Sequence, residues 1–485
     1  MALILLLAPP LVASLSVMLV RGRMRLVAAS TVALNALSLS ASVWMCGDAL
    51  WRGRTIVSSD GFWRVDGLSA LLALSIATVT LLASAFGPGL GEADEYDEGQ
   101  ARRFRIFVNA FALMMLVAVT TNNVGFMWVT IEATTITSAV VIPLHRTKSS
   151  VEASWKYLLI CSVGIALAFA GTVLAYFDFV STAGRVPNAL NWTVLRAAAP
   201  TLQGELMQLA FAFIVVGYGT KAGLAPMHTW LPDAHSEAPA PLSAMMSGVL
   251  LAVAMYAIAR WKAVVDVALG SDFASQLLLA AGLLSVAVGA FSLVIQRHYK
   301  RMLAYSSVEH IGLVSVGLAL GPLGAFAAWL HLVNHAVAKS MAFLLAGRIL
   351  HRYRTTEIAG VSGLLHVMPW TGRLFAMAIL ALVGLPPFGL FVSEFLLVRA
   401  AIHTGHLWTA AVVLLLVLVA FVSLLGHLNR MLYGAAPVGV AVGESCGWRI
   451  AALAGCAAIL VVLGVALPWP VTGIIERSVS AVVMP

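Results

Sequence analysis

The chain of 485 residues is 61% hydrophobic and only 10% charged, with a mean hydropathy of +0.96. Soluble domains carry about 45–50% apolar and about 25% charged residues, so this composition excludes a soluble protein and predicts an all-α integral membrane protein. The formal net charge of +8 does not indicate nucleic-acid binding, because the basic residues fall in short loops between apolar runs, where they set membrane topology.

The four cysteines stand apart, at Cys46, Cys161, Cys446 and Cys456. The sequence has no CxxC pair and no cysteine–histidine cluster, which are the spacings typical of zinc and iron–sulfur sites. We therefore expect no metal and no cofactor in this chain, and we expect any redox chemistry to belong to partner proteins.

About fourteen apolar runs are each long enough to be a spanning helix, which needs about 20 residues. They lie at about 2–20, 26–47, 67–87, 104–122, 124–143, 157–179, 206–226, 240–259, 274–296, 302–320, 323–348, 371–394, 405–428 and 449–470. The first run has no basic residue before it and no small-residue cleavage site after it, which favours a retained helix over a signal peptide. No segment between the runs is long enough for a separate domain, so we predict one polytopic membrane domain.

The basic residues are shared unevenly between the two sets of alternating loops. One set carries about 18 of the 29 lysines and arginines, and the opposite set carries about nine. Because short cytoplasmic loops are rich in Lys and Arg, we predict that the first set is cytoplasmic and that both termini lie outside a bacterial or archaeal inner membrane. The acidic tract GEADEYDEG at 91–99 then falls in a cytoplasmic loop, either as a solvated patch or as a docking site for a soluble partner.

Two ionisable residues stand out in the first half of the chain, because such residues are rare and costly inside membrane spans. Glu132 lies midway along GFMWVTIEATTITSAVVIP, either as a neutral acid in a packing hydrogen bond or as the titrating member of an ion pair. Lys221 lies in GYGTKAGLAP, where it either reaches the membrane interface or stays buried. Burial and a nearby carboxylate change the pKa of a lysine in opposite directions, so a buried pair of Glu132 and Lys221 would be a switchable proton site.

Further polar residues follow in AGLAPMHTWLPDAHSEAPAP, at 222–241. His228 is near a helix break and is a candidate for either a proton entrance or a relay. We predict that Asp233, His235 and Glu237 lie in the cytoplasmic connection to the next span, as a proton entrance or a helix cap rather than in the central relay.

The segment HLVNHAVAKS places His331, His335 and Lys339 at i, i+4 and i+8, on one face of a helix. Either these histidines are ordinary core residues, or the stripe relays protons along water. Metal binding is not expected, since no nearby carboxylate or cysteine completes a ligand set. On the preceding span, Glu309 and His310 are adjacent and face different sides, so we expect at least one of them to join the stripe.

Glu394 follows VGLPPFGLFVSEF, the second place where Gly-Leu-x-Pro interrupts a span. The first is at 223–226, beside Lys221, and the second is at 384–387. Proline breaks the helix, and unwound backbone at membrane depth requires a protein or water-filled surrounding. Paired breaks beside charges indicate inverted repeats around a transport site; the alternative is two unrelated proline kinks.

Five motifs between about 104 and 396 carry a family resemblance: WVTIEATT, KAGLAPMHTWLPDAHSEAPAPLSAMMSG, KRMLAYSSVEHIG, HLVNHAVAKSMAFLLAG and GLPPFGLFVSEF. They resemble the antiporter-like membrane subunits of respiratory complex I (NADH-quinone oxidoreductase), Mrp cation/proton antiporters and group 4 hydrogenases, and most of all the hydrogenase-4 component F type. The resemblance implies fourteen helices with two inverted five-helix repeats, helices 4–8 and 9–13, in which helices 7 and 12 are broken. The parts would be 1–103 (three N-terminal helices), 104–260 (first repeat), 270–430 (second repeat) and 431–485 (C-terminal helix), within a single domain over 1–485.

The family's charged residues on helices 5, 7, 11 and 12 match Glu132, Lys221, Lys339 and Glu394. The resemblance therefore implies a proton-translocating subunit of a multi-subunit redox complex, of the hydrogenase-4/formate hydrogenlyase or complex I type. Its partners would be other membrane subunits and a peripheral redox arm. Alternatives are a Na⁺/H⁺ antiporter subunit, a non-pumping structural anchor, or an inorganic-carbon uptake subunit with a zinc-bearing partner.

The sequence departs from the family pattern in one span. Many relatives carry a lysine or histidine midway along helix 8, whereas GVLLAVAMYAIAR has neither. Either Glu309, His310 and the His331/His335 stripe bridge the gap with ordered water, or coupling between the two halves is weakened. We also expect no long lateral helix after the last span, unlike one complex I relative.

Overall fold

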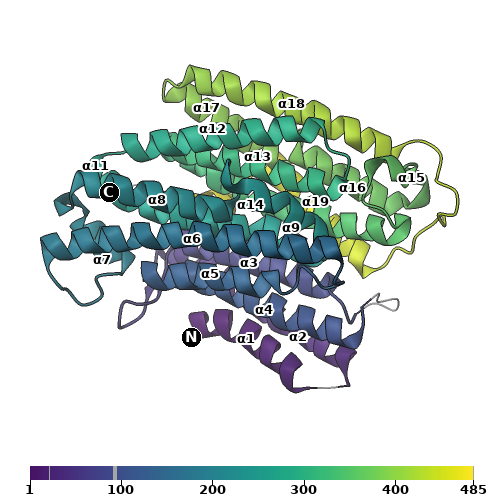
Figure 1. The fold of residues 1–485 in the computed structure, drawn as a ribbon, viewed down its shortest axis with the longest axis horizontal. Helices are drawn as coiled ribbons and strands as arrows, with labels where there is room; N and C mark the ends of the chain where they lie inside the picture. The colour runs from purple at the N-terminus through teal and green to yellow at the C-terminus, as the bar shows by residue number, and fades with distance from the viewer. Residues whose placement is uncertain (21, 91–95, 484–485) are drawn as a thin grey trace.

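The computed structural model describes residues 1–20, 22–90 and 96–483, and these residues are overwhelmingly helical. The first five residues of the acidic tract, 91–95, lie outside the described residues. Figure 1 shows the long helices lying roughly parallel, with α1 and α2 at one edge of the bundle and α17 and α18 at the opposite edge. The one sheet in the described ranges is a small antiparallel hairpin of β1 (Ile56–Val57) and β2 (Arg64–Val65).

The first half of the chain forms eleven α-helices among the described residues. They are α1 (Ala2–Leu19), α2 (Met24–Arg52), α3 (Gly67–Phe86), α4 (Glu98–Thr120), α5 (Val124–Ala139), α6 (Lys148–Ala183), α7 (Trp192–Ala198), α8 (Gly204–Ala222), α9 (Trp230–Glu237), α10 (Ala240–Met245) and α11 (Leu251–Leu269). A π-helical turn, η3 (Met246–Leu250), joins α10 to α11, and short 3₁₀ turns lie at η1 (Ala199–Thr201) and η2 (Met227–Thr229).

The second half supplies the remaining helices. They are α12 (Asp272–Val294), α13 (Tyr299–Ala319), α14 (Gly321–Tyr353), α15 (Leu364–Val367), α16 (Pro369–Leu382), α17 (Gly389–His403), α18 (Leu407–Leu432), α19 (Trp448–Val465) and α20 (Trp469–Val482), with a 3₁₀ turn at η4 (Ile358–Gly360). Eleven helical stretches of the described chain are long and apolar enough to cross a membrane, and Pro369–Leu382 is a shorter apolar helix.

Side-chain caps fix where several spans begin. Asp66 accepts a hydrogen bond from the backbone N–H of Ser69 at the start of α3, and Asn123 accepts one from Phe126 at the start of α5. At α4, Asp97 and Gln100 form a reciprocal capping box. These caps satisfy amides that have no partner within the helix, so the chain turns sharply into each span.

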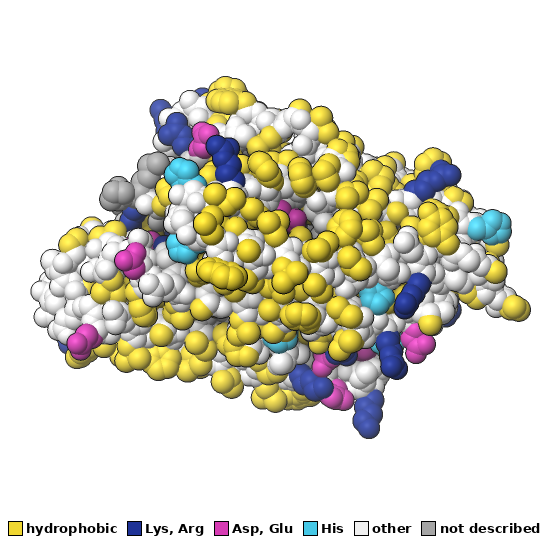
Figure 2. Space-filling model, turned by 90° about the horizontal axis from the view of Figure 1, so that it is seen from above, with side chains coloured by type: hydrophobic (Ala, Val, Ile, Leu, Met, Phe, Trp, Pro, Cys, Tyr) yellow, Lys and Arg dark blue, Asp and Glu magenta, His cyan; other side chains and the backbone are white. Residues whose placement is uncertain are grey.

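The predicted all-α membrane fold is confirmed, and every predicted span coincides with a helix or an interrupted pair of helices. The number of crossings and the repeat boundaries stay predictions. Figure 2 shows hydrophobic side chains over the middle of one face, with most of the charged ones toward its ends, as a lipid environment requires. The short helices α7 and α20 were not predicted, because each is well below the length of a span.

Both predicted helix breaks are present, and they share a backbone geometry. α8 ends at Gly223 (φ +78°) and α16 is followed by Gly384 (φ +64°), both in the left-handed region that favours glycine. In each case the next residue, Leu224 or Leu385, donates its backbone N–H to a carbonyl five residues earlier, at 2.9 and 3.2 Å respectively. The chain then turns through a cis X–Pro bond into a second helix, α9 or α17. The two breaks thus share one backbone geometry, while the repeat relation between them stays a prediction.

Candidate proton path

Lys221 lies in the last turn of α8, immediately before the first break, and only 1% of it is exposed. Its Nζ donates hydrogen bonds to the hydroxyls of Thr135 on α5 (2.7 Å) and Tyr157 on α6 (2.9 Å). It also lies 4.9 Å from the centre of the Tyr157 ring. The alternative in which this lysine reaches the membrane interface is therefore wrong.

Glu132 lies on α5 and is half-buried. Its carboxylate accepts hydrogen bonds from Thr135 Oγ1 (3.0 Å) and Ser162 Oγ (2.7 Å). No direct ion pair joins Glu132 and Lys221 in the described structure, so the predicted pair exists only through Thr135. Because Thr135 accepts from Lys221 and donates to Glu132, the hydrogen bonds run in one direction, from the amine to the carboxylate.

Lys339 is fully buried in the middle of α14. Its Nζ donates to the Leu303 carbonyl (2.7 Å) and to the Ser306 hydroxyl, both on α13. Among the described residues it has no ion-pair partner within 4 Å, in contrast to the carboxylate-linked lysine of the first half. The hydrogen-bond partners of Lys339 are thus neutral oxygens, while the Glu309 carboxylate acts on its charge from beyond ion-pair distance.

The three histidines of α13 and α14 lie together, as the helical spacing predicts. His310 Nδ1 and His331 Nε2 are 2.9 Å apart, and the ring of His335 lies 5.2 Å from that of His310. All three are buried, and neither ring nitrogen of His335 has a hydrogen-bond partner in the described chain. Of the Glu309–His310 pair, His310 thus joins the stripe by direct contact.

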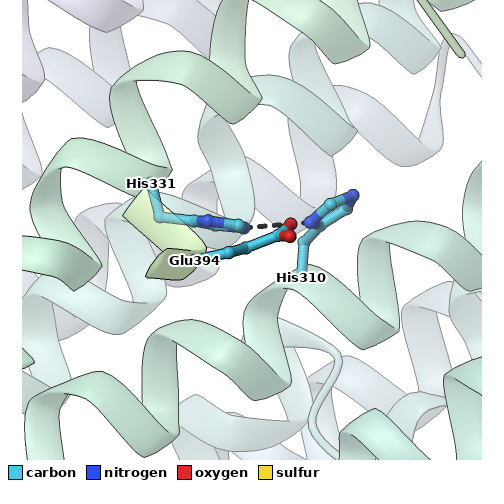
Figure 3. Close-up of side chains that lie close together, drawn as sticks. All are labelled: His310, His331 and Glu394. Carbon is cyan, nitrogen blue, oxygen red and sulfur yellow. Dashed lines mark hydrogen bonds between the residues drawn. The ribbon is translucent and has the colours of Figure 1, made fainter. Parts of the chain in front are cut away.

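The two carboxylates of this region lie on different helices, α13 and α17. Glu309 packs against α12, where a Cβ on Gly289 would stand 2.8 Å from the Cβ of Glu309. Glu394 lies on α17, and its carboxylate packs directly against the second break. A Cβ added to Gly384 would stand only 2.0 Å from Oε2 of Glu394. The carboxylate of Glu394 also approaches His310 and His331, as Figure 3 shows. In the tertiary structure, Glu394 thus lies at the end of the histidine stripe, although it is 63 residues after His331 in the chain.

The prediction that His235 lies in a connecting loop is wrong. It lies in α9 and is fully buried, with its ring 5.9 Å from that of Trp230 and 5.8 Å from that of Phe343 on α14. Neither of its ring nitrogens has a partner among the described residues. His228 is half-buried in η2, with its ring 6.3 Å from that of Tyr305.

The acidic neighbours of His235 do lie toward the polar end of the bundle. Asp233 pairs with Lys156 (3.3 Å) and Arg301 (2.8 Å), and Glu237 accepts a hydrogen bond from Ser149 (2.9 Å). α9 is amphipathic, so alternate residues of one short stretch face opposite environments. A plain connecting segment, as predicted, would give all three residues one environment, whereas the helix gives them two.

Sequence reasoning missed several residues that hold this site. Thr135, Tyr157 and Ser306 bind the two lysines, and hydroxyl residues are too common in spans to signal that role. Lys300 was not among the predicted site residues, yet it is buried and donates to the carbonyls of Ser236 and Ala238 (2.8 Å for Ala238) at the end of α9. A cation near a helix C-terminus is favourable. The hydrogen bonds of Lys300 therefore hold the C-terminal end of α9 against α13.

Comparisons with known proteins agree with this geometry. A family model described as NADH:quinone oxidoreductase/Mrp antiporter, TM matches residues 121–420. The chain belongs to this family. The matched range holds both broken helices and all the candidate residues, and the predicted resemblance is confirmed.

Two curated relatives illustrate the range of this antiporter family. The chain is 42% identical over 310 residues to a hydrogenase-4 component F homolog of Methylacidiphilum infernorum (isolate V4), a match that covers 64% of this chain and 65% of the relative. It is 31% identical over 354 residues to hydrogenase-4 component B of Escherichia coli (strain K12), covering 68% and 49%. The chain thus spans about half to two thirds of the length of these curated relatives.

A solved structure extends the likeness to nearly the whole fold. A chain of the membrane-bound sulfane sulfur reductase, an archaeal respiratory membrane complex, superposes with a TM-score of 0.88 at 26% identity and covers 99% of this chain and 97% of its own. The protein is accordingly a multi-pass membrane protein of the antiporter-like type.

Proposed function

We propose that this chain is a proton-translocating subunit of a multi-subunit membrane redox complex, of the hydrogenase-4/formate hydrogenlyase or complex I type. The observation that carries the proposal is the directed contact from Lys221 through Thr135 to Glu132, placed against a broken helix. A proton leaving Lys221 has a hydroxyl-linked acceptor within hydrogen-bond reach, which is the geometry that proton transfer requires.

His235 offers a bridge between the two halves, in place of the lysine or histidine that helix 8 lacks. The ring of Tyr157, which binds Lys221, lies tilted at 4.7 Å from that of Trp230, and Trp230 contacts His235. On its other side His235 contacts Phe343, one helical turn beyond Lys339. A buried histidine with two unpartnered nitrogens suits a relay that ordered water completes.

From Lys339 the proposed route continues along α14 toward the second break. His335 lies one turn before Lys339, and the hydrogen-bonded pair of His310 and His331 leads on to Glu394. Glu394 then releases the proton on the side that the loop charges predict to be outside. The two broken helices thus stand at the two ends of the path.

The surroundings of Glu132 support partner subunits. The carboxylate is half-buried on α5, on which Val129 and Ile136 are 48% and 55% exposed. A carboxylate beside lipid is costly, so we propose that a neighbouring membrane subunit covers this face. Electron transfer in a peripheral arm would then bias Glu132 and Lys221 across that contact.

The test is Lys221→Ala in the intact complex, reconstituted into vesicles. We expect electron transfer to continue while proton pumping, measured with a pH-sensitive dye, falls to the background. Wild-type levels of both activities would exclude the pumping role and favour the structural anchor. Pumping that requires Na⁺ and survives a protonophore would instead favour the sodium antiporter.

A further inference from the structure

His310, His331 and Glu394 come from three helices, α13, α14 and α17, and converge at one point (Figure 3). One potential ligand atom from each lies within 4.8 Å of the others. Metal binding was not expected from the sequence, because no carboxylate lies near the histidines in the chain. The fold removes that objection by bringing Glu394 beside them.

The hydrogen bonds around His331 fix which of its nitrogens faces the centre of this cluster. Ser393 Oγ donates to the Leu390 carbonyl (2.8 Å), so its proton is used, and it accepts from His331 Nδ1 at 2.9 Å. Neutral His331 therefore carries its proton on Nδ1 and presents a free lone pair on Nε2, toward His310. Ligand histidines in metal sites are oriented in the same way, by a hydrogen bond from the second ring nitrogen.

His310 is arranged to give up the proton that occupies the centre. Its Nδ1 donates to His331 Nε2 in the tautomer that Ser393 imposes, while its Nε2 is buried and has no hydrogen-bond partner among the described residues. If the ring proton moves from Nδ1 to Nε2, the lone pairs of both histidines point at the same place. The two facing nitrogens then need a cation between them.

We propose that His310, His331 and Glu394 bind a divalent transition-metal ion of the zinc class. Two imidazoles and one carboxylate are a set that zinc accepts, whereas sodium prefers oxygen ligands. Ligands about 2.0–2.1 Å from zinc in a tetrahedron stand about 3.3 Å apart. The facing nitrogens of His310 and His331 are 2.9 Å apart, and the three ligand atoms all lie within 4.8 Å of one another. The separation that zinc requires lies between these two distances, so small side-chain rotations complete the site.

Glu394 also connects the site to a cavity of about 330 Å³ between α13, α17 and α18. Of the described side chains that line this cavity, Glu394 is the charged one, and the others are apolar, such as Phe391, Phe395 and Phe421. The cavity leaves room beside Glu394 for a water molecule as the fourth ligand. An ion there would occupy the atoms proposed to pass protons to Glu394, so it would block the path.

The test is zinc binding to the purified full-length protein in detergent, measured by competition with a coloured chelator and by elemental analysis. Wild type is expected to bind one equivalent more than H331Q or E394Q. Each of these variants loses a ligand, so we expect at least about 100-fold weaker binding, since even a second-shell change costs about 10–100-fold. S393A leaves all three ligands in place but frees the His331 tautomer, and we expect about 10-fold weaker binding.

The matched control is H427Q, because His427 is also a buried histidine but bonds the Leu293 carbonyl on α12, away from the site. It should bind as much zinc as wild type. Cobalt substituted into the wild-type protein reports the ligand set by its visible spectrum, without relying on any variant. The proposal fails if wild type binds no zinc, or if H331Q and E394Q retain the wild-type equivalent. Either result leaves the proton-pumping proposal standing, because that rests on Lys221 and a pumping measurement.

Discussion

The two broken helices are alike in backbone and different in chemistry. Each ends at a left-handed glycine and continues through a Leu-x-Pro turn. At the first break, Lys221 is connected through one hydroxyl to a half-buried carboxylate. At the second, Glu394 faces two histidines, and Lys339 stands two helical turns away from His331 with only neutral oxygen partners.

On the proposed proton path, this difference gives each half of the chain a different task. In the first half, the cation and the carboxylate are close enough to control one another, so an outside charge can shift the proton between them. In the second half, histidines lie between Lys339 and Glu394, so a proton that passes between these two groups would have to travel along the stripe. We infer that the first half is the switch and the second half is the conduit.

The largest effect is expected from Lys339→Met, which removes the titrating group of the conduit and keeps its length. Positioned acid–base groups contribute about 10²–10⁴-fold to proton transfer, so pumping should fall by about 100-fold while electron transfer continues. The same vesicle assay with Lys339→Arg, which keeps the charge but does not release its proton, should give a similar loss. Normal pumping by Lys339→Met would show that protons do not pass through Lys339, and the assignment of the second half as the conduit would then be wrong.

Alanine substitution at Gly223 and Gly384 tests whether the two breaks, which share a backbone geometry, differ in how well they tolerate a side chain. A side chain in the left-handed region costs roughly 1–2 kcal/mol. In Gly384→Ala the new Cβ would also stand 2.0 Å from the Glu394 carboxylate, whereas in Gly223→Ala it would meet the flexible end of Leu231 at 2.4 Å. Both variants should melt at a lower temperature, and Gly384→Ala should melt lower than Gly223→Ala. The reverse order would show that Glu394 does not rest on the break.

Thr135→Val interrupts the switch without removing either charged group. The hydroxyl that connects Lys221 with Glu132 is replaced by a methyl group of nearly equal volume, so we expect about a 10-fold loss of pumping, about 1.4 kcal/mol. Thr135→Ser keeps the hydroxyl and serves as the control in the same assay. Equal pumping by the valine and serine variants would mean that the proton leaves Lys221 by another route.

His235→Phe probes the contact between the two halves. The ring against Trp230 and Phe343 is kept in shape, while both nitrogens are lost. Because water fills part of any relay, we expect a smaller effect, about a threefold loss of pumping with unchanged thermal stability. Wild-type pumping in this variant would mean that His235 does not replace the lysine or histidine that helix 8 lacks.

Much of the fold was predictable from the sequence, because lipid imposes simple rules on it. Spanning helices need long apolar runs, and the runs coincide with the helices observed. Glu132, Lys221, Lys339 and Glu394 were found because charge inside such runs is rare. α20 was missed because its 14 residues are too few for a span, and its burial against α3 comes from packing that no local pattern reveals.

The sequence alone therefore determined the membrane class, the two breaks and the charged residues, since each follows from the cost of polar groups in lipid. Only the tertiary structure decided which groups meet. It placed Thr135 between Lys221 and Glu132, buried His235 between the two halves, and brought Glu394 to His310 and His331. These contacts join residues far apart in the chain, and their geometry is set by how the helices pack, which local sequence does not encode.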